Sequence, residues 1–113
     1  MEEAVIYGTE AVHSDPYAMG FVIEAEGKRY WITGDTLYSK ALLEGLPLPL
    51  EAVFLPVNGV GNNMNARDAR LLAEKTEAKF AVPLHTGLLD DLTPGVFLGK
   101  NRVLPEIWKE IVL

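Results

Sequence analysis

The first third of the chain alternates apolar and polar positions and is rich in β-branched and aromatic residues. This alternation is typical of strands that bury one face. It predicts strands over residues 4–7, 20–25 and 29–33. Glu26 and Gly27 separate the last two strands. Because glycine tolerates the positive φ of a tight turn, these two strands are expected to form an antiparallel hairpin.

The second half has a different pattern. Residues 51–57 form a near-continuous apolar run, which is typical of a strand buried on both faces, and Pro56 places its end. After a loop over residues 58–65, Asn65 is a good N-cap for a helix whose apolar positions are Ala66, Ala69, Leu72 and Ala73. Residues 78–84 read as the next strand. Strand, helix and strand in this order predict a right-handed parallel crossover.

Three further segments complete the expected fold. Residues 37–44 are predicted to form a short helix that ends at Gly45, residues 88–100 an irregular surface segment, and residues 104–113 a short amphipathic helix. The fold class is then α/β, with a mixed sheet, an antiparallel hairpin leading into it, and a single domain over residues 1–113.

Composition narrows the classes of function. The chain has 113 residues, of which 49% are hydrophobic, so one modest core is expected rather than a disordered chain. With a net charge of −6, the chain is not expected to bind nucleic acid. The sequence has no cysteine, so a metal would need His, Asp or Glu ligands. It has neither a basic signal sequence nor a long apolar run, so no membrane association and a cytoplasmic location are expected.

Three potential metal ligands follow predicted strands. His13 and His85, which are the two histidines of the sequence, and Asp35 each stand where a strand ends and a loop begins. Strand ends are where α/β folds place ligands. Two imidazoles and a carboxylate suit zinc or another first-row metal. The alternative is that the histidines are hydrogen-bonded turn residues and Asp35 caps a loop.

The sequence gives less support to a nucleotide-binding loop or to a serine nucleophile. The loop over residues 59–64 follows a strand and precedes a helix, as a phosphate-binding loop does, but Met64 replaces the third glycine of the dinucleotide motif. The sequence has no Gly-x-Ser-x-Gly nucleophile elbow. No catalytic residue independent of a metal is therefore assigned.

An ordered series of short motifs runs over roughly residues 10–90. Its members are His13-Ser14-Asp15-Pro16, Gly20-Phe21-Val22-Ile23, Gly27-Lys28-Arg29, Thr33-Gly34-Asp35-Thr36, Pro56-Val57-Asn58-Gly59, Asn63-Met64-Asn65 and Val82-Pro83-Leu84-His85. The series resembles the C-terminal half of a metallo-β-lactamase-fold hydrolase, and it is most similar to the branch of ascorbate-6-phosphate lactonase and related metal-dependent hydrolases. It implies half of an αββα sandwich, with helices on one face of the sheet.

The resemblance also implies roles for individual residues. His13 would bind one divalent metal, Zn or Mn, Asp35 would bridge two metals, and His85 would bind the second. The nucleophile would be a hydroxide whose pKa the metals lower. The amides of Asn62, Asn63 and Asn65, near a helix N-terminus, would help to hold a phosphorylated or carboxylated substrate.

One part of the family pattern is missing. The family's first metal motif, H-x-H-x-D-H, lies upstream of the position matched by His13, and here only 12 residues precede His13. The metal site is then incomplete, so we expect a truncated or partial hydrolase that is inactive alone. The alternatives are a non-enzymatic, self-associating module and a metallo-hydrolase assembled across a dimer. An isolated half would leave an apolar sheet face uncovered, which predicts a homodimer or a missing N-terminal half as partner.

Overall fold

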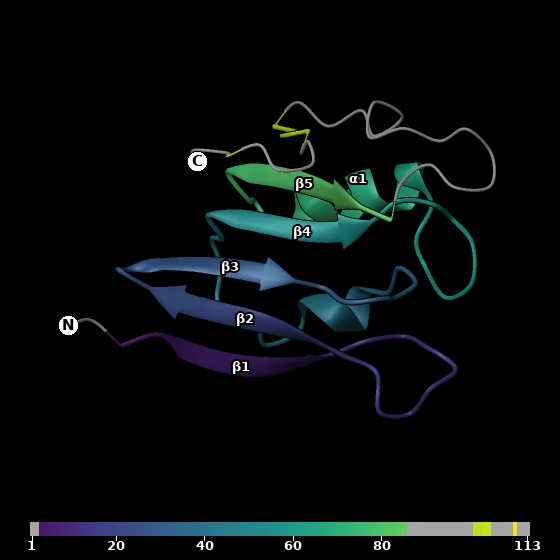
Figure 1. Ribbon diagram of the computed structural model, residues 1–113, viewed down its shortest axis with the longest axis horizontal. Coiled ribbons are helices and arrows are strands. Elements are labelled where there is room, and N and C mark those ends of the chain that lie inside the picture. Colours follow the sequence, from purple (N-terminus) through teal and green to yellow (C-terminus); the bar gives the residue numbers. More distant parts are fainter. Residues whose placement is uncertain (1–2, 86–100, 105–109, 111–113) are drawn as a thin grey trace.

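A five-stranded mixed sheet forms the centre of the fold (Figure 1). The computed structural model describes residues 3–85, 101–104 and 110. The sheet has the order β1-β2-β3-β4-β5, and its first three strands are antiparallel, whereas β4 pairs in parallel with β3 and β5. The strands are β1 (Val5–Glu10), β2 (Met19–Ala25), β3 (Lys28–Ile32), β4 (Ala52–Pro56) and β5 (Phe80–Leu84). The predicted mixed α/β sheet with a leading antiparallel hairpin is confirmed.

The hairpin turns at the two residues that the sequence indicated. Glu26 has a φ of 53° and Gly27 a φ of 76°. A type I′ turn needs a positive φ at both central residues, and its twist matches that of the flanking strands. The turn therefore sets the register that places Glu24 opposite Arg29, where the two side chains form an ion pair of 3.0 Å.

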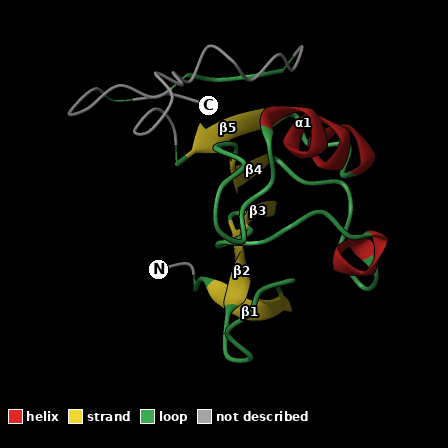
Figure 2. Ribbon diagram, turned by 90° about the vertical axis from the view of Figure 1, so that its right-hand side faces the viewer, coloured by secondary structure: helices red, strands yellow, loops and turns green. Residues whose placement is uncertain are grey.

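Two helical segments lie on the same side of the sheet (Figure 2). The helix α1 (Ala66–Lys75) begins where it was predicted, because the side chain of Asn65 accepts a hydrogen bond from the backbone N–H of Asp68. Its buried residues Ala69, Leu72 and Ala73 follow helical spacing. The chain runs from β4 through α1 to the parallel neighbour β5, which is the predicted crossover order.

The helix predicted over residues 37–44 is wrong in type and length. The structure has a 3₁₀ helix η1 (Lys40–Leu43) of four residues. Its start is delayed because the backbone N–H of Leu37 donates to the carbonyl of Val12, and Ser39 acts as the N-cap. Gly45, with a φ of 77°, follows the C-cap residue Glu44.

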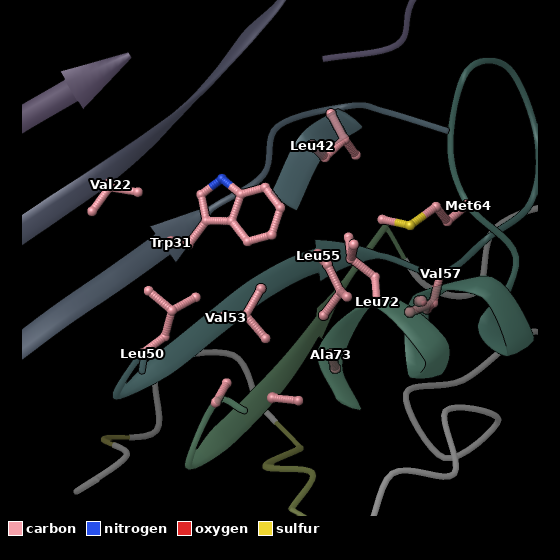
Figure 3. Packing of buried hydrophobic residues seen from close by; sticks show 13 residues of the cluster. Val22, Trp31, Leu42, Leu50, Val53, Leu55, Val57, Met64, Leu72 and Ala73 are labelled. Atoms are coloured by element: carbon pink, nitrogen blue, oxygen red, sulfur yellow. The ribbon is translucent and has the colours of Figure 1, made fainter. Parts of the chain in front are cut away.

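The core lies between the sheet and the helical segments α1 and η1 (Figure 3). Trp31 is fully buried in its centre, and its indole N–H donates to the Thr9 hydroxyl at 3.1 Å. Burial on this scale supplies most of the stability of a small domain. The other large buried apolar side chains are Val22, Leu42, Leu50, Val53, Leu55, Val57, Met64 and Leu72.

β1 is longer and β5 is shorter than expected, since β5 begins at Phe80 rather than at residue 78. β1 continues to Glu10, past the predicted end at Tyr7, because residues through Glu10 pair with β2. The segments predicted for residues 88–100 and 104–113 lie outside the described residues or largely so. Within the described ranges, no helix has the length and apolar character needed to cross a membrane.

Candidate metal centre

The three predicted metal ligands lie in loops at one edge of the sheet. The carboxyl ends of β3, β4 and β5 and the loop between β1 and β2 all lie at the right-hand side of Figure 1. His13 lies in the β1–β2 loop, Asp35 follows β3, and His85 follows β5. Parallel pairing of β3, β4 and β5 brings segments together here that are about 50 residues apart in sequence.

Asp35 and His85 are in direct contact. The His85 Nε2 atom lies 2.7 Å from the Asp35 Oδ1 atom, and the two side chains are 50% and 47% exposed. His85 has a φ of 51°. A non-glycine residue in the left-handed region carries a conformational cost, and such strain gathers at functional sites.

Two glycines determine where Asp35 leaves the sheet. Gly34 has a φ of 69°, and a Cβ there would lie 2.6 Å from the Met19 carbonyl oxygen. On the facing strand, a Cβ at Gly20 would lie 2.4 Å from the Thr33 carbonyl oxygen. No side chain fits at such distances, so glycine at both positions allows β2 and the chain after β3 to touch. The backbone that carries Asp35 is thereby held against β2.

His13 is held near Asp35 by its loop. The backbone N–H of Val12 donates to the Thr36 hydroxyl at 2.8 Å, and that of Leu37 donates to the Val12 carbonyl at 3.1 Å. The His13 Nδ1 atom accepts a hydrogen bond of 3.0 Å from the backbone N–H of Asp15. This is the turn role that the sequence left open. Because Nδ1 is the acceptor, the neutral imidazole carries its proton on Nε2, which in this tautomer is a donor rather than a metal ligand.

Thr36 is the residue whose contribution the sequence analysis missed. It is fully buried, and its hydroxyl also donates to the Leu37 carbonyl at 2.9 Å. Threonine hydroxyls commonly bond nearby backbone groups, so a threonine directly after the Gly-Asp pair was the available signal. Its partner, Val12, is 24 positions away, which sequence spacing does not indicate.

The three asparagines have separate environments. The Asn62 Nδ2 atom donates to the Ser14 hydroxyl at 2.9 Å, which ties the loop before α1 to the His13 loop. The Asn63 Oδ1 atom is buried and accepts no hydrogen bond within the described part of the chain. The Asn65 oxygen is engaged as the cap of α1. Their predicted role in holding a substrate stays a prediction.

The donors present suit a divalent metal but do not complete a site. A carboxylate and imidazoles are ligands that zinc and manganese accept. In residues 3–85, 101–104 and 110, no group of three or more His, Cys, Asp or Glu side chains is close enough to hold an ion. Asp35 and His85 therefore provide two adjacent donors, with His13 on a neighbouring loop.

Comparison with known proteins identifies hydrolase relatives. The chain is 37% identical over 70 residues to a UPF0173 metal-dependent hydrolase of Listeria innocua, a match that covers 61% of this chain and 30% of the relative. It is 42% identical over 67 residues to a UPF0173 metal-dependent hydrolase of Bacillus pumilus, with 58% and 29% covered. The match thus spans less than a third of the length of these relatives. No protein-family model matches the chain.

Solved structures identify the fold. Igni18, a metallo hydrolase from Ignicoccus hospitalis, matches with a TM-score of 0.69 at 24% identity, covering 83% of this chain and 43% of that one. The metallo-β-lactamase fold protein YhfI from Bacillus subtilis matches with a TM-score of 0.70 at 13% identity, covering 92% and 49%. The chain has part of the metallo-β-lactamase fold. The likeness predicted from its motifs is confirmed at this level.

This part of the metallo-β-lactamase fold leaves the candidate metal centre open. Asp35 and His85 are about half exposed, so water reaches both. A groove of about 480 Å³ lies elsewhere, between β1, β2 and residues 41–47, and includes none of the candidate ligands. Within the described residues, the candidate centre is therefore an exposed edge rather than an enclosed cleft.

Proposed function

We propose that this chain supplies one side of the metal site of a metal-dependent hydrolase. The contact of 2.7 Å between Asp35 and His85 at the sheet edge carries the proposal. Its support is threefold: the donor types suit zinc or manganese, the His85 backbone is strained, and the relatives are named metal-dependent hydrolases.

Each candidate ligand has a distinct part in the proposal. Asp35 would supply a carboxylate to the site and reduce the net positive charge there. His85 would bind a metal through Nε2 after releasing the proton that this atom directs at Asp35 Oδ1. His13 would bind through Nε2 as the tautomer that gives up the hydrogen bond from Asp15. A bound divalent metal would act as a Lewis acid and lower the pKa of water, which is the chemistry that hydrolysis needs.

The proposed site is incomplete in this chain alone. Catalytic zinc sites use three protein ligands, and a closed site strengthens electrostatic interactions by excluding water. Here two donors are in contact and both are exposed. We therefore propose that the chain is inactive without further ligands. A lactonase-like substrate with a phosphate or carboxylate would meet the side-chain amide of Asn62, which donates to Ser14 in the neighbouring loop. A cytoplasmic location belongs to the same proposal.

The test compares two carboxylates of this chain. Asp35→Asn keeps the shape of the side chain but removes its charge, and Asp68→Asn does the same on α1. We expect Zn²⁺, titrated against a chromophoric chelator, to bind the parent chain and Asp68→Asn equally and Asp35→Asn at least about tenfold more weakly, because one ligand is lost. Circular dichroism checks that all three proteins fold.

Two results would contradict the proposal. One is equal Zn²⁺ and Mn²⁺ affinity for Asp35→Asn and Asp68→Asn. The other is a parent chain that takes up less than about a tenth of an equivalent of metal under saturating conditions.

A self-associating module without enzymatic activity is the second candidate function. The observation that favours it is the apolar sheet surface that the described residues leave open, on which Ile6 is 63% exposed. The two candidates differ in metal binding, so an associating chain that binds no metal would support the module alone.

A further inference from the structure

The strand β1 forms an edge of the sheet, and its outer side is unpaired within the described residues (Figure 1). Alternate residues of an edge strand direct their backbone N–H and C=O groups outward, where they can pair with another extended chain. The opposite edge of the described sheet differs, because Ala81 in β5 donates to the Asn101 carbonyl and accepts from the N–H of Val103. β1 is therefore the edge at which the sheet can take a further strand.

The sequence of β1 lacks the features that usually keep an edge strand from pairing. Proteins commonly protect such edges with lysine, proline or a β-bulge. The segment Val5–Glu10 contains neither lysine nor proline, and its six residues pair with consecutive residues of β2 without a bulge. Val5 and Ile6 are β-branched, which favours the extended conformation. A regular, unprotected edge of this kind is suited to binding an extended peptide.

A groove beside this edge indicates which side chains such a peptide would carry. The groove, of about 480 Å³, lies along β1, β2 and η1. Tyr7, Val22 and Leu42 line it with apolar groups, and Glu24 and Glu44 add carboxylates. The described residues that line it include no lysine or arginine. A long basic side chain suits both features, because its aliphatic stem packs on apolar surface while its charged end meets a carboxylate.

Of the carboxylates that line the groove, Glu44 is the one available to a ligand beside η1. The carboxylate of Glu24 is already paired with Arg29 at 3.0 Å. Glu44 is exposed, and its side chain forms no ion pair within the part of the chain that the structure describes. A cation entering the groove therefore meets Glu44 without displacing an existing partner.

We infer that β1 binds an extended basic peptide of a partner protein, which adds to the sheet as a further strand and places a lysine or arginine in the groove. Pairing of backbone groups supplies the affinity. The groove supplies specificity, because alternate side chains of an added strand point to the same side of the sheet. The net charge of −6 favours the approach of a basic segment. The groove lies apart from the candidate metal ligands, so the inference does not depend on metal binding.

The test uses a dye-labelled synthetic peptide that alternates lysine and valine and is long enough to span the six residues of β1. Fluorescence anisotropy, with the chain as titrant, is expected to give a dissociation constant below about 1 mM. Two further peptides carry N-methyl groups, one on every odd-numbered amide and the other on every even-numbered amide. Only one of these sets faces β1 in an added strand. One methylated peptide should therefore bind at least about tenfold more weakly than the parent peptide, and the other within about threefold of it.

A reversal of charge in the groove tests the choice of side chain. Glu44→Lys places a cation in the groove, and Glu77→Lys makes the same change of charge after the end of α1. We expect Glu44→Lys to weaken binding of the parent peptide at least about fivefold, and Glu77→Lys to weaken it by less than about twofold. Circular dichroism checks that both variants fold.

Several results would overturn the inference. No binding of the parent peptide at about 1 mM of the chain is one. Equal binding of the two methylated peptides is another, because it would mean that no backbone pairing occurs. Equal weakening by Glu44→Lys and Glu77→Lys would show that the peptide responds to net charge alone. Finally, a dimer of the chain that excess peptide dissociates would show that a second copy, rather than a basic peptide, occupies the edge.

Discussion

At the scale of single residues, His85 combines a functional position with an unfavourable backbone. Its φ of 51° is one of three positive values at non-glycine residues, with Glu26 at 53° and Glu77 at 55°, among those described. Glu26 and Glu77 stand in a hairpin turn and after a helix, where the local geometry requires a left-handed residue. His85 instead stands at the end of β5, where its imidazole meets Asp35.

Replacing His85 with glycine tests whether its contact with Asp35 stabilises the fold or is held there at the cost of a strained backbone. We expect His85→Gly to leave the free energy of unfolding unchanged or to raise it by up to about 1 kcal/mol, because glycine adopts positive φ without steric cost. Glu77→Gly, the control at the C-terminus of α1, should raise it by a similar amount. Urea unfolding measures both. If His85→Gly destabilises the fold by more than about 1 kcal/mol, the His85–Asp35 contact supports the fold itself.

At the scale of elements, the site depends on how closely β2 and the end of β3 approach. Gly20 and Gly34 permit that approach, and Thr36 then joins the Asp35 loop to the His13 loop through Val12. The strands could be predicted because their alternation is a local property. The helix predicted over residues 37–44 was wrong because a distant partner, the Val12 carbonyl, holds Leu37 outside the helix.

Substitution by alanine should lower the stability of the fold by different amounts at Gly20 in β2 and at Gly8 in β1. A Cβ at Gly20 would lie 2.4 Å from a backbone oxygen, so Gly20→Ala is expected to destabilise the fold by at least about 2 kcal/mol. At Gly8 the nearest atom would be 3.6 Å away, in the flexible Met19 side chain, so Gly8→Ala should cost less than about 0.5 kcal/mol. Thermal unfolding measures the stability of both variants. Equal losses of stability would contradict the close approach between β2 and the chain after β3.

At the scale of the whole molecule, charge and apolar surface act in opposite directions on association. Each copy carries a net charge of −6, so two copies repel one another at low salt. In the self-associating module, the exposed side chains of Ile6, Met19 and Phe21 would provide the attraction. Because such a contact contains few charges, salt should screen the repulsion without weakening the attraction.

Salt dependence therefore tests the nature of the contact. Between about 0.01 M and about 1 M NaCl, the screening length falls from about 30 Å to about 3 Å. For the self-associating module, we expect the dissociation constant of the dimer to fall at least about threefold over this range, as measured by sedimentation. A dissociation constant that rises with salt would indicate a contact built on ion pairs instead.

The sequence by itself determined the elements whose signals are local. Alternation predicted the first three strands, a near-continuous apolar run predicted β4, and the Asn65 cap predicted the start of α1. The ordered motifs predicted the metallo-β-lactamase likeness, and the roles of His13, Asp35 and His85 as metal ligands stay a prediction. Only the tertiary structure decided which of these ligands touch and which surface stays open. Those features depend on strand pairing and on backbone contacts between residues far apart in the chain, and no local pattern encodes either.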